Sequence, residues 1–289
     1  MRRLRWLIVL MPLVPTAPFA AAQFSCSVSA TTMNFGTYTG SLSIPGPTPV
    51  TVTCPFFSSY NVALNAGLGA GATTTTRKMT GPGSATLSYQ MFQNSSLTTN
   101  WGNTVGTDTV AGIGFIGAQN YNIYPRAAAG QIVAPGIYTD TITVSVIPSF
   151  GTTVTTTFTV TATVPATCTI SASALNFGNY SGALINAASA LTVTCTNLTT
   201  FNIGLNAGTA TGATVTNRKM TSPASATLNY VLFRDSARTV NWGNTIGTDT
   251  LISQGNGTAV QYGVFGQMAA GQSGNPAVYT DLITATITY

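Results

Sequence analysis

The chain has few residues that could carry acid–base or nucleophilic chemistry. Its 289 residues include no histidine and no glutamate, and its acidic residues are five aspartates. Without an imidazole, Ser–His–Asp and Cys–His catalysis and histidine-based metal sites are excluded. Asp108 and Asp140 recur as Asp249 and Asp281, which is typical of structural turns and strands. We therefore expect no enzyme activity, no metal and no cofactor.

One glycine-rich segment has the spacing of a nucleotide-binding loop. Gly112–Gly117 matches the pattern GxGxxG. That motif requires a helix directly after it, and the residues leading to Pro125 show no helical pattern. A nucleotide site is not expected.

The first residues have the order of a cleaved secretory signal. Three arginines within the first five residues precede the apolar run Trp6–Val14, and three alanines end at Ala22. Since this run is too short to span a bilayer, we predict a signal peptide at residues 1–22 and a mature chain, beginning near Gln23, with no membrane span. The mature chain keeps seven Lys and Arg against five Asp. This scattered positive charge gives no case for nucleic-acid binding.

The rest of the chain consists of two related halves. Segments recur at a shift of 141 or 142 residues, which indicates two domains, each large enough to bury its own core. The recurring segments are Asn34–Gly36 with Asn176–Gly178, Asn65–Gly67 with Asn206–Gly208, Arg77–Thr80 with Arg218–Thr221, Asn100–Asn103 with Asn241–Asn244, and Tyr138–Asp140 with Tyr279–Asp281. We expect the repeated Arg–Lys pairs at solvated strand ends or loops.

The repeat also selects a cysteine pairing. An exported chain matures in an oxidising compartment, where disulfides are expected. Each half holds one pair at matching positions, so we predict the bridges Cys26–Cys54 and Cys168–Cys195. Each closes a loop of about 27 residues and contributes about 3 kcal/mol in a loop-entropy model.

Composition and alternation predict an all-β fold. Charged residues make up 5% of the chain, and no stretch keeps a helical apolar period. Apolar residues alternate with polar or small ones at Leu191–Cys195, Ile142–Val146 and Ile283–Tyr289, between turns rich in Gly, Pro and Asn. This pattern is typical of an antiparallel β-sandwich.

The segment Val154–Val164 is an additional strand. Eleven alternating residues form a strand of about 36 Å, with an apolar face of Val154, Phe158, Val160, Ala162 and Val164. It has no counterpart between Gln23 and Cys26, and the second half ends at Tyr289 on the strand that precedes it in the first half. We predict that it closes the first domain as a donor-like strand, whereas the second domain keeps an open edge that another chain can fill.

A series of short motifs occurs in the same order in both halves. They are Cys-x-(Ile/Val)-Ser, Asn-Phe-Gly, Val-x-Cys, Leu-Asn-Ala-Gly, Arg-Lys-Met, Leu-x-Tyr, Trp-Gly-Asn and Tyr-Thr-Asp. This order resembles the spore coat protein U domain family, which includes subunits of archaic, Csu-type chaperone–usher pili. The resemblance implies two tandem immunoglobulin-like, pilin-type antiparallel β-sandwiches, the second incomplete and in need of a donor strand.

The resemblance also implies a domain organisation and partners. We expect the signal peptide at 1–22, an N-terminal adhesin domain at 23–147, a linker with the donor-like strand at 148–165, and a C-terminal pilin domain at 166–289. The implied partners are the N-terminal donor strand of the next pilus subunit, a periplasmic chaperone, an outer-membrane usher, and an abiotic or host surface. The chain would pass through the periplasm to the cell surface in a fimbria. With no donor strand before Cys26, it is expected to end a fibre as the tip adhesin.

Loops of the first half are more apolar than those of the second half. Because the resemblance implies attachment and biofilm formation through apolar loop tips, we hypothesise a surface formed by Leu42, Ile44, Phe115, Ile116, Ile132 and Val133. Strand direction and parity predict that residues 132–136 and 42–47 lie at the pole far from the linker. A non-adhesive subunit of a pilus or a spore-coat-like layer, a glycan-binding module and an enzyme are the alternative functions.

Overall fold

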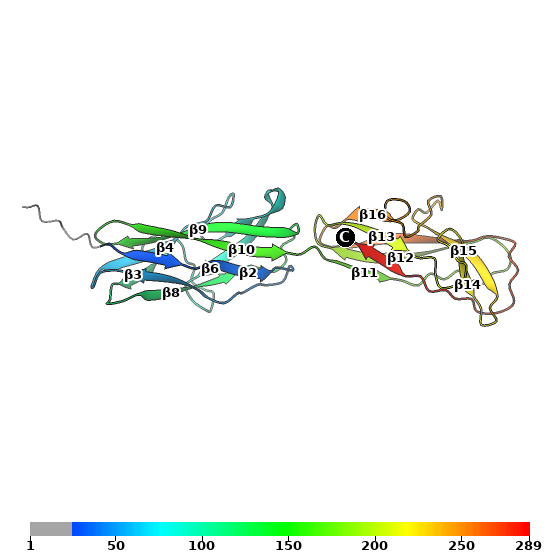
Figure 1. The fold of residues 1–289 in the computed structure, drawn as a ribbon, viewed down its shortest axis with the longest axis horizontal. Helices are drawn as coiled ribbons and strands as arrows, with labels where there is room; N and C mark the ends of the chain where they lie inside the picture. The colour runs from blue at the N-terminus through cyan, green and yellow to red at the C-terminus, as the bar shows by residue number, and fades with distance from the viewer. Residues whose placement is uncertain (1–24) are drawn as a thin grey trace, which may run out of the picture.

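The computed structural model describes residues 25–289, which form two β domains placed end to end (Figure 1). We call Cys26–Val164 domain 1 and Cys168–Tyr289 domain 2; the linker Pro165–Thr167 joins them. The predicted all-β fold is confirmed. The predicted signal peptide, residues 1–22, lies outside the described residues. Within residues 25–289, no helix is long and apolar enough to cross a membrane.

Domain 1 is a sandwich of ten strands joined in one hydrogen-bonded network. One layer holds β1, β3, β8, β6 and β5, and the other holds β2, β10, β9, β4 and β7. Apolar residues of both layers, such as Val50 and Val62, belong to one buried cluster. The elements are β1 (Ser27–Ala30), β2 (Met33–Thr37), β3 (Thr48–Thr53), β4 (Ser59–Leu64), β5 (Arg77–Thr80), the short 3-10 helix η1 (Pro82–Ser84), β6 (Thr86–Phe92), β7 (Val110–Ile113), β8 (Gln119–Arg126), β9 (Gly136–Pro148) and β10 (Val154–Val164).

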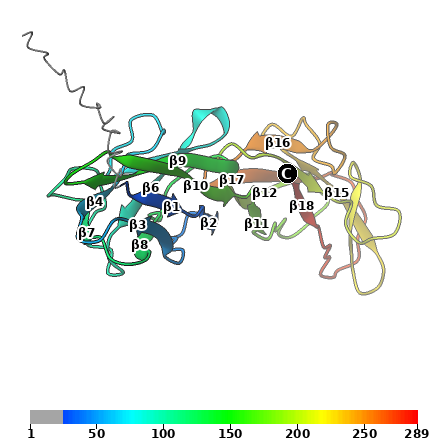
Figure 2. The same ribbon diagram turned by 60° about the vertical axis from the view of Figure 1, so that its left-hand side comes forward.

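The long strand β10 closes domain 1. It pairs with β9 in antiparallel orientation over all eleven residues, and with β2 in parallel on its other side. Figures 1 and 2 show β9 and β10 side by side along the domain. Because side chains alternate along a strand, Phe158, Val160, Ala162 and Val164 face the core, each with at most 5% of its surface exposed. Domain 1 thus contains its own last strand.

Domain 2 repeats this sandwich without its last strand. Its layers are β11–β12–β17–β15–β14 and β16–β13–β18. β18 is an edge strand, and residues 175–179, which correspond to β2, form no strand. The strands are β11 (Cys168–Ala172), β12 (Ile185–Cys195), β13 (Thr200–Leu205), β14 (Arg218–Thr221), β15 (Thr227–Phe233), β16 (Leu251–Gln254), β17 (Ala259–Met268) and β18 (Ala285–Thr288). The layer that β10 completes in domain 1 is therefore open in domain 2.

The repeated cysteines and arginines hold equivalent places in the two domains. Both predicted disulfides are present and join the first strand of each domain to its neighbour. Arg77 and Arg218 are fully buried, so the expected solvated position was wrong. Burial lowers the pKa of Arg77 to about 10, yet four backbone carbonyls satisfy its guanidinium. These acceptors, at 2.7–3.1 Å, are Leu64, Asn65, Thr74 and Trp101.

Replacing Phe158 with alanine tests whether β10 is an integral strand of domain 1. Since the ring is 4% exposed, Phe158→Ala should lower the free energy of unfolding of domain 1 by about 3–5 kcal/mol. Urea unfolding of the mature chain measures this change. Thr157→Ala, on the outer face of β10, is the matched control and should stay within about 0.5 kcal/mol of the parent. Equal effects of the two substitutions would contradict the burial of β10.

Candidate functional site

A groove runs along the open layer of domain 2. It has a volume of about 410 Å³ and lies between residues 172–177 and residues 279–285. Leu191, Leu205 and Val264 line its base. All three belong to the buried core of the domain. The groove therefore gives direct access to the apolar interior of domain 2.

Domain 1 shows what occupies the equivalent space. Groove residues of domain 2 that are only partly buried have counterparts in domain 1 that are at most 6% exposed. The pairs are Leu175 and Met33, Phe177 and Phe35, Met220 and Met79, Tyr279 and Tyr138, and Ile283 and Ile142. In domain 1, Phe158 of β10 lies opposite Ile142, and Ala162 lies opposite Tyr138. The groove thus corresponds to the position of β10.

Asp281 lies in the groove wall, but its carboxylate already has partners. It accepts a hydrogen bond from the Tyr230 hydroxyl at 2.7 Å and one from the Thr209 backbone N–H at 2.9 Å. Burial and then the hydrogen bond to Asp281 raise the pKa of Tyr230, so the phenol remains protonated and keeps donating. Asp140 and Tyr89 form the same pair in domain 1, also at 2.7 Å. Domain 1, which contains β10, and domain 2, which lacks that strand, share this pair. We therefore assign the pair a structural role in fixing the wall of the groove.

A second candidate surface lies at one end of domain 1. We call the end of each domain that carries the disulfide its head pole, and the opposite end its tail pole. In domain 1 the loops 54–58, 114–118 and 149–153 form the head pole, and the loops 38–47 and 127–135 form the tail pole. β10 runs from the head pole back to the linker. The tail pole therefore faces domain 2, and the head pole lies at the end remote from domain 2 (Figure 1).

Large apolar side chains are exposed at the head pole of domain 1. Phe57, Ile116 and Phe150 expose 73%, 93% and 92% of their surface, and Phe56 and Phe115 expose about half. The ring centroid of Phe56 lies 3.9 Å from that of Phe57 and 6.5 Å from that of Phe115. Exposed apolar side chains that gather at one end of a domain mark interaction surfaces. We call these five residues the apolar head cluster.

Backbone hydrogen bonds support the loops of this cluster. The Phe57 N–H donates to the Gly114 carbonyl at 2.9 Å, and the Ser149 N–H donates to the Ser59 carbonyl at 2.9 Å. A Cβ atom at Gly114 would lie 2.0 Å from the Pro55 carbonyl oxygen, so only glycine permits this close approach. The cluster therefore rests on loops that are tied to one another.

The six residues expected to contact a surface are divided between the two poles. Phe115 and Ile116 belong to the apolar head cluster. The others lie at the tail pole: Leu42, Ile44 and Ile132 are 52–58% exposed, and Val133 is buried. The expected far position of residues 132–136 and 42–47 was wrong, because β9 runs away from domain 2 and β10 returns to it.

Sequence reasoning did not select Phe56, Phe57 or Phe150. The first two replace Asn197 and Leu198 of the second half, and Phe150 lies in a turn without a counterpart there. The direction of β10 was the missing signal. Once β10 is the returning strand, the loop before it and the loops that share its pole lie at the end remote from domain 2.

The two domains define a tandem β-sandwich protein whose second sandwich lacks one strand. The chain belongs to the spore coat protein U domain family, whose profile matches residues 14–145 and 154–286. Protein U of Myxococcus xanthus is 37% identical over 163 residues, which span 50% of this chain and 90% of that protein.

Comparison with solved structures finds similarity to pilus proteins. One is the CsuC–CsuE chaperone–tip adhesion subunit pre-assembly complex from archaic chaperone–usher Csu pili of Acinetobacter baumannii. A chain of that complex is 17% identical, with a TM-score of 0.51 and coverage of 92% of this chain and 100% of that chain. The CupB6 tip adhesin of Pseudomonas aeruginosa is 10% identical, with a TM-score of 0.43 and coverage of 91% and 94%. The first match supports the two-domain pilin-type fold.

A peptide with the sequence of β10 should bind the groove of domain 2. At a peptide concentration one hundred times Kd, the free energy of unfolding of domain 2 should rise by about 2.7 kcal/mol. Calorimetry of the mature chain measures this as a higher melting temperature of domain 2. A peptide carrying Phe158→Ser and Val160→Ser is the matched control, since it cannot fill the apolar base. No shift with the unaltered peptide up to its solubility limit would contradict the equivalence of groove and β10.

Proposed function

We propose that this chain is the adhesive end subunit of a fimbria that is assembled through a periplasmic chaperone and an outer-membrane usher. The observation that carries the proposal is the difference between the two domains. Domain 1 contains its own last strand and exposes the apolar head cluster, whereas domain 2 lacks that strand and presents a groove. A subunit that uses its extra strand to complete its own first domain, and whose second domain accepts a strand from a neighbour, fits the end of a linear assembly.

The groove supports the assembly part of the proposal. A partner strand with alternating apolar side chains can pair with the edge of β18 and fill the groove, as β10 does in domain 1. We assign this strand to the N-terminal segment of the next subunit. Before assembly, a strand of the periplasmic chaperone covers the same groove; the CsuC–CsuE structure joins a chaperone to such a subunit.

The apolar head cluster supports the adhesive part. Its loops, residues 54–58, 114–118 and 149–153, contain no charged residue. Removing apolar surface from water contributes about 25 cal/mol per Å² and requires no defined partner group. Such a contact suits abiotic or host surfaces that present apolar area. It would mediate attachment and the start of a biofilm.

Substitutions at the two poles of domain 1 test the adhesive surface. Phe57→Ser, Ile116→Ser and Phe150→Ser together should reduce bacterial attachment to polystyrene about tenfold, which corresponds to about 1.4 kcal/mol. The matched control is Leu42→Ser with Ile44→Ser, since these side chains are exposed at the tail pole. Immunogold labelling verifies that each variant still reaches fibre ends. Loss of attachment in the tail-pole variant alone would overturn the assignment.

Attachment through this cluster should persist at high ionic strength. At about 1 M salt the Debye length falls to about 3 Å, which screens contacts between exposed charges, but the cluster carries no charge to be screened. The number of attached cells on polystyrene should therefore stay constant or rise between low salt and 1 M sodium chloride. A steep fall would indicate an ionic contact and contradict the apolar mechanism.

A further inference from the structure

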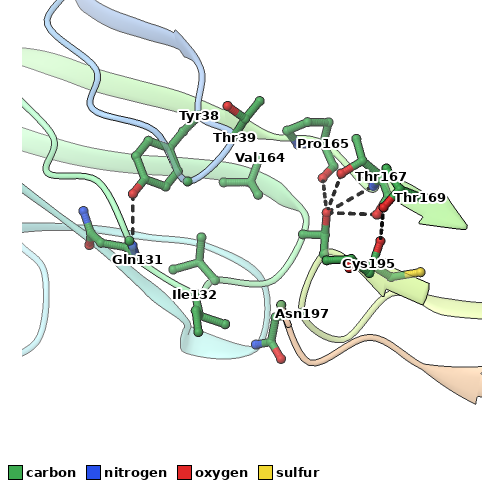
Figure 3. Close-up of a pocket in the computed structure, with 16 residues that line it drawn as sticks. Tyr38, Thr39, Gln131, Ile132, Val164, Pro165, Thr167, Thr169, Cys195 and Asn197 are labelled. Atoms are coloured by element: carbon green, nitrogen blue, oxygen red, sulfur yellow. Dashed lines mark hydrogen bonds between the residues drawn. The ribbon is translucent and has the colours of Figure 1, made fainter. Parts of the chain in front are cut away.

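The tail pole of domain 1 packs against the head pole of domain 2. Figure 3 shows Ile132 beside Asn197 at this junction, with Val164 and Pro165 above them. Gly257 provides the space for Ile132, because a Cβ atom on Gly257 would lie 2.7 Å from Ile132 Cγ2. A larger side chain at position 257 would therefore meet the Ile132 side chain.

A threonine of the head pole also holds the linker. Thr196 Oγ1 donates to the Pro165 carbonyl and accepts from the Thr167 N–H, both at 3.1 Å. The Thr196 N–H donates to the Thr167 carbonyl at 2.9 Å. These contacts attach the segment between the domains to the head pole of domain 2 (Figure 3).

The head pole of domain 1 differs from that of domain 2 at these same positions. The corresponding loops have equal lengths. Ser59, which follows the first loop, pairs with Ile113, which precedes the second, and Thr200 pairs with Gln254 in the same way. After the second loop, Gln119 pairs with Val52, and Val260 pairs with Val193. Within these loops the corresponding residues are Pro55 and Thr196, Phe56 and Asn197, and Ile116 and Gly257.

Each of the three differences removes a feature of the junction. Pro55 has neither an N–H nor a hydroxyl, so it cannot hold a linker as Thr196 does. Ile116 puts a branched side chain at the sequence position where domain 2 has Gly257, and Phe56 puts a larger one at the position of Asn197. Domain 1 therefore has the framework of a docking pole but an altered contact surface.

We propose that the head pole of a spore coat protein U domain is the docking surface for the tail pole of the domain that precedes it, and that Pro55, Phe56 and Ile116 close this surface in domain 1. This deepens the proposed function, on which its second half rests, because it gives a reason from side chains why the head pole of domain 1 would not accept a further domain. The same substitutions supply part of the apolar head cluster, so one change of surface both ends the stack and exposes the contact.

A cysteine pair across the junction tests the docking contact. An ideal Cβ atom at Gly257 lies 3.6 Å from Ile132 Cβ, within the range of about 3.5–4.5 Å that a disulfide requires. The full chain carrying Ile132→Cys and Gly257→Cys should form a third disulfide in most molecules, as peptide mapping without reduction would detect. Because Gly257 has a φ of +78°, which strains any side chain there, Gly257→Cys alone is the folding control. A pair that stays reduced, while this single variant folds with both native disulfides closed, would overturn the proposal.

Transfer of the residues of domain 1 to domain 2 tests the closing role. In the chain that carries Ile132→Cys and Gly257→Cys, we add Thr196→Pro and Asn197→Phe. Equilibration with glutathione measures the effective concentration of the two thiols, which should fall about tenfold, equivalent to about 1.4 kcal/mol. Asn217→Phe, in an exposed loop away from the junction, is the control and should change nothing. If Thr196→Pro prevents folding, Thr196→Val removes only the hydroxyl and should act in the same direction. Unchanged pairing in the transferred variant would overturn the closing role.

An extended chain tests domain 1 directly. A second copy of residues 25–167 is fused to the N-terminal side of Cys26, with Ile132→Cys in the added copy and Ile116→Cys in the original domain 1. Adding Pro55→Thr and Phe56→Asn to the original domain gives it the residues of domain 2 at these positions. The effective concentration of the two new thiols should then rise about tenfold. Equal values with and without these two changes would contradict the proposal. None of these three measurements depends on attachment or fibre assembly, so failure of the proposed function would be seen separately.

Discussion

The antiparallel pairing of β10 with β9 is the constraint on which the rest of the structure depends. Because β9 ends at the head pole, β10 must return the chain to the opposite end of domain 1. Domain 2 then begins at the tail pole, and the head pole lies remote from domain 2. The same pairing places β10 against β2, where it covers Met33 and Phe35. Chain direction and core closure thus follow from a single strand.

The missing equivalent of β10 has a cost for domain 2. Burying Phe158, Val160 and Val164 in domain 1 contributes roughly 1.5–3 kcal/mol per side chain. The sum is comparable to the whole stability of a typical domain, about 5–15 kcal/mol. Domain 2 forgoes this contribution and also exposes the unpaired edge of β18, which is a template for wrong pairing. A strand supplied by a partner resolves both problems at once.

The sequence predicted the features that repeat or alternate, because both leave a local pattern. The two domains and their disulfides follow from the repeat, and β10 follows from its unbroken period of two. Strand direction leaves no such pattern. The pole at which Ile132 lies could be predicted only by treating β10, and not β9, as the strand that returns to the linker. The burial of Arg77 could not be predicted from the neighbouring sequence either. Its four carbonyl acceptors come from three segments that are separate in the chain, residues 64–65, residue 74 and residue 101. A guanidinium is buried only where the fold gathers such acceptors.

The division between repeated framework and divergent tips explains how one fold can serve two roles in one chain. At the tail pole, Tyr38 donates to the Ala128 carbonyl as Tyr180 donates to that of Ala269. These groups hold the bases of the loops in both domains. The differences at the head poles, such as Ile116 in place of Gly257, lie at loop tips beyond this framework. One backbone hydrogen bond differs at these tips, because the Gly257 N–H donates to the Cys195 carbonyl at 3.1 Å and Ile116 makes no equivalent bond within the described residues. The side-chain bonds that hold the loop bases are kept, so a docking surface can become a terminal contact surface without loss of the fold.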